Sequence, residues 1–392
     1  MSEPLPQWNE YLRLLEPAGA LPLRTWQPDS EQLRAEVYRQ VLMNLSLGYF
    51  MYFQADPDHP DFAPFLNSVY LLQPNPDDTY FYARVAGEGL YRISGDRGTV
   101  KLLTFTVGRN MIGMSETPSP QLGEYDADTL EIRPDGAFEV LFSSERPAGY
   151  RGNWLRLDPQ AEHIVVRQRC YDWGGERDAR LAIERLDAPS PLKPALTAAQ
   201  IDQRLRGAIG FAERLGRTWF DYQNALRKRV APNTLDFTGF KQFGGVAVQT
   251  YWQGVYELAE HEALILETEL PEQCPYWNVQ LNDPLWNTVE YVHRQSSLNG
   301  HQARLDADGR FRAVIAVDDP GVPNWLDTGG YRLGTLVGRW YACSSNPMPT
   351  LKRVPLAELR RHLPPDTPAV SPERRAQGLA ARRRGGQLRR RW

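Results

Sequence analysis

Two stretches decide the fold: TLEIRPDGAFEVLF at residues 129–142 and QARLDADGRFRAVIAV at residues 302–317. Each places a turn that ends in glycine, Gly136 or Gly309, between runs that favour extended structure. Asp-Gly between such runs is a strong short-range signal for a β-hairpin. We therefore expect a hairpin in each stretch, and a β-rich chain.

The sequence that follows each hairpin is also repeated. The first is followed by Asn153-Trp154-Leu155 and the second by Asn324-Trp325-Leu326, at nearly the same distance from the turn glycine. An arginine-bearing, strand-like run comes next in both copies, at residues 166–169 and 337–339. Self-similarity of this kind predicts a duplicated structural unit, here a β-sandwich.

Two amphipathic helices are expected beside the repeats. Residues 29–54 open with Asp29 and Gln32 at capping-box spacing, and apolar residues then recur every four positions. The second helix begins at Thr197, again with glutamine three residues on, and follows a proline-rich stretch at 188–194 that is typical of a linker.

These patterns divide the chain into five parts. They are an N-terminal helical segment (1–60), a first β-sandwich (61–187), a linker and helix (188–232), a second β-sandwich (233–362) and an arginine-rich tail (363–392).

Composition indicates a folded, intracellular protein. The chain has 392 residues, of which 42% are hydrophobic and 24% charged, close to ordinary globular usage. Its three cysteines, Cys170, Cys274 and Cys343, are too few and too far apart for a disulfide-stapled scaffold or a four-cysteine zinc site. No leader pattern and no apolar run of about 20 residues is present. We therefore expect a cytoplasmic protein without a transmembrane segment.

The charge is unevenly distributed. The net charge is −3, yet residues 374–392 hold eight arginines and no acid, which leaves −11 on the rest of the chain. A self-repelling segment with little to bury is expected to be disordered. It is expected either to dock on the acidic body or to bind an anionic partner such as a nucleic acid or a membrane surface.

Several motifs resemble those of a known family, the domain-of-unknown-function 1214 (DUF1214) proteins. They are YWNVQL (276–281), RQSSLN (294–299), DPGVPNWLDTGG (319–330), GRW (338–340) and, near the N-terminus, NPDDTY (75–80). The resemblance covers most of residues 30–360. It implies two tandem jelly-roll-like β-sandwich domains, with a shape similar to that of peptide-N-glycosidase F. Together with the N-terminal and inter-domain helices expected above, this gives a mainly β fold. The resemblance transfers no activity and no catalytic residue.

The run at 319–330 is the candidate site, because it gathers carboxylates, amides and guanidinium groups around a tryptophan. The residues expected to act in catalysis, by proton transfer or by bonding the reacting oxygen, are Asp327, Asp319 and Asn324. Those expected to bind substrate are Arg294, Asn299, Trp325 and Arg339. The same residue types also fasten loops in β-sandwiches, so a structural role stays open. Arg294 and Asp327 lack clear counterparts in the first copy, which favours a functional role for them.

Motifs for nucleotides, nicotinamide cofactors, serine hydrolases and zinc proteases are absent from the sequence. We therefore expect no cofactor and no metal. The predicted function is that of a cofactor-independent hydrolase or lyase acting on a small amphipathic molecule, with its pocket on the second sandwich. The alternative is a non-catalytic protein that binds carbohydrate or lipid. The sequence indicates no oligomeric state.

Overall fold

The first β-sandwich is built from two sheets. The computed structural model describes residues 5–66, 70–240 and 248–389. In the first sandwich, a five-stranded sheet has the order β1-β2-β8-β4-β5 and a four-stranded sheet has the order β7-β6-β3-β9. The strands are β1 (Ala63–Pro64), β2 (Asp78–Arg84), β3 (Tyr91–Asp96), β4 (Leu102–Gly108), β5 (Gly123–Asp126), β6 (Ala137–Ser143), β7 (Trp154–Arg156), β8 (His163–Arg169) and β9 (Arg180–Arg185). Alternate residues such as Ile93, Phe105 and Val166 fill the space between these sheets.

The second β-sandwich has the sheet orders β10-β11-β17-β13-β14 and β16-β15-β12-β18. Its strands are β10 (Leu235–Thr238), β11 (Gln249–Glu257), β12 (Glu262–Thr268), β13 (Tyr276–Asn282), β14 (Ser297–Asn299), β15 (Phe311–Ala316), β16 (Trp325–Asp327), β17 (Leu333–Tyr341) and β18 (Thr350–Pro355). Trp252, Trp277 and Trp340 lie in its core.

The two sandwiches repeat one topology strand for strand, because β1–β9 and β10–β18 occupy the same places in the two sheet orders. Each four-stranded sheet even contains one parallel pair, Leu141 opposite Trp154 in the first and Val314 opposite Trp325 in the second. The mainly β fold of two tandem sandwiches is confirmed.

The expected hairpins are wrong in their pairing. Gly136 and Gly309 do turn the chain, with φ of 87° and 77°. However, β6 pairs with β3 and β7, and β15 pairs with β12 and β16. The residues before the first turn form no strand, and of those before the second turn only Leu305 pairs, in an isolated antiparallel bridge with Phe311.

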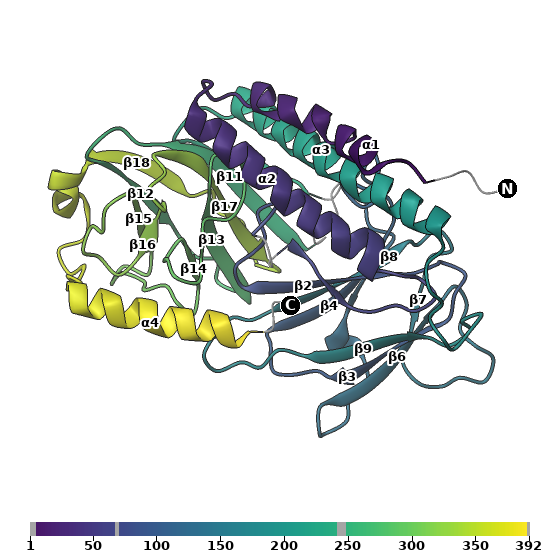
Figure 1. Cartoon of the computed structure of the whole chain (residues 1–392). Helices are drawn as coiled ribbons and strands as arrows, with labels where there is room; N and C mark the ends of the chain where they lie inside the picture. The colour runs from purple at the N-terminus through teal and green to yellow at the C-terminus, as the bar shows by residue number, and fades with distance from the viewer. Residues whose placement is uncertain (1–4, 67–69, 241–247, 390–392) are drawn as a thin grey trace.

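Helices run side by side across both sandwiches (Figure 1). They are α1 (Trp8–Arg13), the 3₁₀ helix η1 (Glu16–Arg24), α2 (Glu31–Tyr49), the π-helical turn η2 (Phe50–Gln54) and α3 (Ala198–Arg229). The capping box of Thr197 and Gln200 begins α3 as expected. Helix α2 is capped by Ser30 rather than Asp29, because the Ser30 hydroxyl accepts a hydrogen bond from the Leu33 amide. None of the helices in the described ranges is long and apolar enough to cross a membrane.

The expectation of disorder in the C-terminal tail is wrong for residues 372–388. The last element of the described chain is α4 (Pro372–Leu388). Two short helices not named above are η4 (Ala127–Thr129) in the first sandwich and η6 (Leu356–His362) in the second. Figure 1 shows α4 along the second sandwich with its end directed at the first. Residues 390–392 lie outside the described residues.

Three arginines spaced seven apart explain the order of α4, since that spacing places them on one helix face. Arg375 binds Asp319 of the second sandwich at 2.8 Å. Arg382 donates to the Tyr291 carbonyl at 2.6 Å. Arg389, which follows α4, donates to the carbonyls of Pro76 and Asp77 at 2.6 Å each. These charge-assisted hydrogen bonds offset the repulsion expected among the arginines.

Candidate ligand cavity between the sandwiches

A cavity of about 150 Å³ lies between the two sandwiches. Each five-stranded sheet faces this cavity with the side that points away from the core of its own sandwich. Tyr80 and Arg167 line it from the first sheet, and Tyr251 and Arg339 line it from the second. Within each sheet the tyrosine stands opposite the arginine in register, so the duplication brings two equivalent Tyr–Arg pairs to one cavity.

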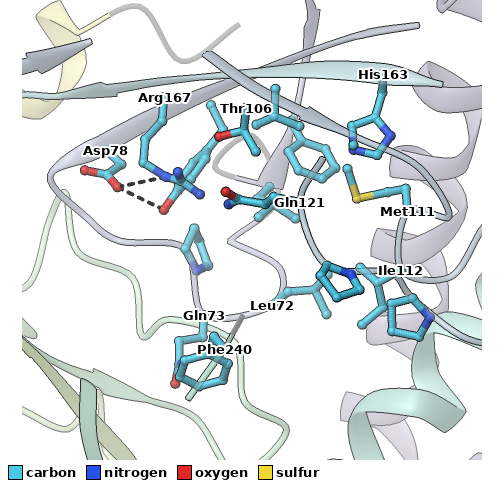
Figure 2. Close-up of a pocket in the computed structure, with 18 of the residues that line it drawn as sticks. Leu72, Gln73, Asp78, Thr106, Met111, Ile112, Gln121, His163, Arg167 and Phe240 are labelled. Carbon is cyan, nitrogen blue, oxygen red and sulfur yellow. Dashed lines mark hydrogen bonds and ion pairs between the residues drawn. The ribbon is translucent and has the colours of Figure 1, made fainter. Parts of the chain in front are cut away.

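One side of the cavity is apolar. Helix α3 contributes Trp219, and loops contribute Trp286, Phe240, Leu72 and Ile112. The rings of Trp219 and Trp286 have their centroids 4.4 Å apart, and all of these residues except Leu72 are buried. Figure 2 shows Leu72, Ile112 and Phe240 on the side opposite Arg167. This wall suits a hydrocarbon or aromatic part of a ligand.

The polar end is organised by Asp78, the first residue of β2. Its carboxylate accepts two hydrogen bonds from Arg169, at 2.6 and 2.8 Å, and one from the Tyr80 hydroxyl at 3.1 Å. Arg167 Nε lies 3.5 Å from Asp78 Oδ2 (Figure 2). Burial raises the pKa of Asp78, but the charge and hydrogen bonds of Arg169 outweigh burial and the net pKa is lowered. The carboxylate is therefore ionised at neutral pH.

Arg339 and Arg167 differ in how their guanidinium groups are satisfied. Arg339 donates to Gln280 Oε1 at 2.6 Å and to Asn278 Oδ1 at 3.2 Å. The Nη1 group of Arg167 is buried and has no hydrogen-bond partner in the structure as described. The pKa of Arg167 is lowered by burial, but its neighbours Tyr80 and Asp78 reverse this and the net shift is upward, so the group stays charged.

Strand register explains the difference. Thr104 of β4 stands opposite Arg167 as Asn278 of β13 stands opposite Arg339. Thr106 then corresponds to Gln280. The threonine hydroxyls are too short to reach the guanidinium as the amides do, and both hydroxyls are buried without a partner in the part of the chain that the structure describes. Arg167 is thus a charged donor open to the cavity.

The charge of the cavity wall is positive. Among its described residues, the acid Asp78 is accompanied by three arginines, Arg109, Arg167 and Arg339. Arg169 lies behind them and is paired with Asp78. Since one carboxylate faces several guanidinium groups, the cavity favours an anion.

His163 lines the same cavity at some distance from Asp78 along the sheet (Figure 2). Its Nδ1 is buried with no hydrogen-bond partner within the described ranges. Burial lowers the pKa of His163 to about 3, so the imidazole is neutral at pH 7.

The residues expected to act in catalysis are tied into the loops around them. Asp327 forms an ion pair with Arg294 at 2.9 Å and accepts a hydrogen bond from the Gly329 amide. Asp319 binds Arg375 of α4 and accepts from the Gly321 amide. Asn324 bonds three backbone groups on the neighbouring strand and loop. Their catalytic roles stay predictions.

The residues expected to bind substrate are spread over three places. Arg339 lines the cavity between the sandwiches. Arg294 borders a separate hollow of about 590 Å³ beside α2. Asn299 is buried against Asp77 and the Tyr171 carbonyl, and Trp325 is buried with its indole donating to the Ala316 carbonyl. The structure therefore does not gather these residues into one pocket.

Sequence reasoning missed the importance of Asp78, Thr106, His163 and Arg167 to the cavity. In the sequence, Asp78 belongs to the NPDDTY motif and Arg167 to a repeated, strand-like run. The available signal was that β8 and β17 each carry an arginine at a position facing away from the sandwich core. The two arginines come to one cavity only because the outer faces of the two sheets meet in the folded chain.

Comparisons with known proteins support the fold and leave the activity open. The model of a family described as "Protein of unknown function (DUF1214)" matches residues 84–172, in the first sandwich, whereas most of the motifs that suggested this family lie in the second. The crystal structure of an uncharacterized protein from Burkholderia cenocepacia has 33% sequence identity and a TM-score of 0.83, and the match covers 89% of this chain and 97% of that one. A Vibrio parahaemolyticus protein matches 87% of this chain and all of its own, at 11% identity and a TM-score of 0.46. No curated protein matches.

Proposed function

We propose that this chain, which belongs to the DUF1214 family of proteins of unknown function, binds a small amphipathic anion between its two sandwiches. The observation that carries this proposal is the buried Nη1 group of Arg167, which is charged and lacks a hydrogen-bond partner in the described chain. A buried, unsatisfied donor of this kind destabilises a protein unless a ligand or water completes it.

A carboxylate is the ligand group that best fits this donor. Its two oxygens match the planar fork of a guanidinium, and the buried surroundings strengthen the interaction. The hydroxyl of Thr106, which lines the cavity, offers a further donor on the same sheet as Arg167. Asp78 is already bonded to Arg169, so it sets the position of the arginines without neutralising them all.

The rest of the ligand is expected to be apolar and small. Trp219, Trp286 and Phe240 supply flat apolar surfaces opposite the charged end. The cavity volume of about 150 Å³ limits the ligand to a small molecule. A short-chain or single-ring carboxylic acid satisfies both requirements.

Retention of a ligand by the purified protein tests this proposal. Wild-type protein and the Arg167→Met variant are incubated with a metabolite extract, washed, denatured and analysed by mass spectrometry. A carboxylic acid retained by the wild type and lost from the variant is the expected result. Arg92→Met, which changes an arginine on the outer sheet of the same sandwich, is the matched control and should retain the ligand. Equal retention by Arg167→Met, or no retained anion at all, would overturn the proposal.

A second candidate is a cofactor-independent hydrolase or lyase that uses the same cavity. The neutral imidazole of His163, with its buried Nδ1 lacking a partner in the described part of the protein, is the observation that favours it. A pKa of about 3 makes His163 a weak base, so binding is the stronger proposal. The same incubation distinguishes the two. A new product formed by the wild type and not by His163→Gln supports an enzyme, whereas retention without a product supports a binding protein.

A further inference from the structure

Two cysteines that are far apart in the sequence meet where strands β13 and β17 end. The last paired residues of the two strands are Tyr276 and Tyr341. The pairing continues beyond them, because the Ser344 amide donates to the Gln273 carbonyl at 2.8 Å. In this antiparallel register Cys274 and Cys343 face each other across the two strands.

The thiols themselves are neighbours. Cys274 Sγ and Cys343 Sγ both point to the Tyr276 carbonyl, at 3.6 and 3.8 Å. Each thiol also lies close enough to the other to shift its pKa. Facing positions on adjacent antiparallel strands lie about 4.5–5.5 Å apart at Cα, which falls within the range that a disulfide spans.

We propose that Cys274 and Cys343 form a reversible dithiol–disulfide pair, oxidised by small disulfides of the glutathione type. One cysteine thiolate attacks a sulfur of the oxidant, forming a mixed disulfide and expelling one reduced thiol. The other cysteine then attacks the mixed disulfide, forming the intramolecular S–S bond and expelling the second reduced thiol. The two protons lost by the cysteines are taken up by the two expelled thiolates, so the oxidant gains the two electrons that the pair loses.

Two further observations distinguish this pair from an ordinary core contact and from a metal site. Both cysteines are partly exposed, whereas Cys170 is fully buried. In the ranges that the structure describes, no third histidine, cysteine or acid joins them as a metal ligand. Burial raises the pKa of both thiols, so their oxidation is slow at neutral pH and accelerates as the pH rises.

The bond would stiffen the contact between the sandwiches. Tyr276, which lies beside the pair, donates from its hydroxyl to Asp77 of the first sandwich at 2.6 Å. A disulfide here closes a long loop of the second sandwich. We expect the oxidised protein to unfold at a temperature higher by about 5 °C.

Oxidation of the full-length protein with oxidised glutathione in mildly alkaline buffer tests this inference. The wild type should lose two hydrogens by intact mass and yield a non-reduced peptide that links Cys274 to Cys343, and dithiothreitol should reverse both changes. Cys170→Ser, the matched control, should behave like the wild type. Cys343→Ser should carry a single glutathione on Cys274.

Two results would overturn the inference. One is a wild-type protein that carries separate glutathione adducts on both cysteines without a linked peptide. The other is a folded wild type that stays reduced although the same cysteines react after denaturation. Neither result bears on Arg167, so this inference and the proposed function stand or fall separately.

Discussion

In the second sandwich Arg339 is held by the amides of Asn278 and Gln280, whereas the equivalent Arg167 of the first sandwich faces two threonine hydroxyls that do not reach it. The two arginines occupy the same place in the same topology. A duplication therefore supplied two similar faces, and short side chains on one of them left a charged group available. The comparison of the two sandwiches identifies the donor on which the proposed ligand site depends.

The corners of the two sandwiches show the opposite behaviour. Asn153 bonds the Glu131 amide at 2.8 Å and the carbonyls of Glu131 and Glu139 at 2.9 Å each. Asn324 makes the matching three bonds to Arg304 and Arg312. A contact that the fold requires is thus the same in both copies, while the residues facing the cavity differ.

The largest expected effect on the free energy of unfolding comes from replacing Asp78, an acid that the equivalent position of the second sandwich lacks. Asp78→Asn leaves Arg169 and Arg167 buried without a carboxylate and should lower the free energy of unfolding by about 3–5 kcal/mol. Gln249 stands at the equivalent position of β11, and Gln249→Ala should lower it by about 1–2 kcal/mol, because only one hydrogen bond, from the Arg169 guanidinium to an uncharged amide oxygen, is lost. Urea unfolding of both variants measures the difference. Equal losses would contradict the asymmetry described here.

Copying the second face onto the first should close the open arginine. The double variant Thr104→Asn/Thr106→Gln gives Arg167 the same two neighbouring amide side chains that Asn278 and Gln280 give Arg339. Ligand affinity is expected to fall by roughly 30-fold, because a charge-assisted hydrogen bond to the ligand is replaced by an internal one. Calorimetric titration with the retained acid measures the change. The matched control, Thr104→Ser/Thr106→Ser, adds no amide and should bind at close to the wild-type affinity.

The two faces should also differ in their response to acid. Burial lowers the pKa of His163 from its ordinary 6.5 to about 3, so between these values the unfolded chain binds a proton that the folded chain does not. Stability should therefore fall as the pH falls through this window, by about 2 kcal/mol between pH 7 and 5. Thr335 stands at the equivalent position of β17, and His163→Thr should remove this part of the pH dependence. Chemical unfolding at a series of pH values checks it, and an unchanged slope in the variant would assign the acid sensitivity to other groups.

The smallest expected effect concerns the shared corners. Asn153→Ala and Asn324→Ala each remove three hydrogen bonds, and each should lower the free energy of unfolding by about 1–2 kcal/mol. Asn324 is buried and Asn153 is half-buried, so the loss should be the larger for Asn324. Thermal unfolding compares the two. A negligible effect at both positions would mean that the repeated asparagines do not hold these corners.

Much of the fold follows from local sequence patterns. The repeated Asn-Trp-Leu motif predicted the duplication because both copies need the same corner, and the capping box at Thr197 predicted the start of α3 because it acts within one turn. The hairpins were mispredicted for a different reason. Which strand pairs with β6 depends on β3 and β7, and a turn signal carries no information about either.

The site was less predictable, because it exists only where two outer faces meet. Arg339 was expected to bind a ligand and does line the cavity, but its expected partners belong to loops elsewhere. Arg167 looked like an ordinary strand residue, since its open donor results from the short side chains of β4 and from the packing of a second sheet against the first. Asp77 and Arg389 likewise meet only after α4 has docked.

The docking of α4 has a consequence for how the protein is made. The helix follows both sandwiches along the chain, so each sandwich leaves the ribosome before the arginines that join them. Until Arg375, Arg382 and Arg389 arrive, the carbonyls of Pro76 and Asp77 and the carboxylate of Asp319 lack the partners that they have in the finished molecule. Helix α4 is therefore the last element to bridge the two sandwiches. A chain that ended before α4 would have an incomplete contact between the sandwiches, and limited proteolysis would be the simplest way to detect it.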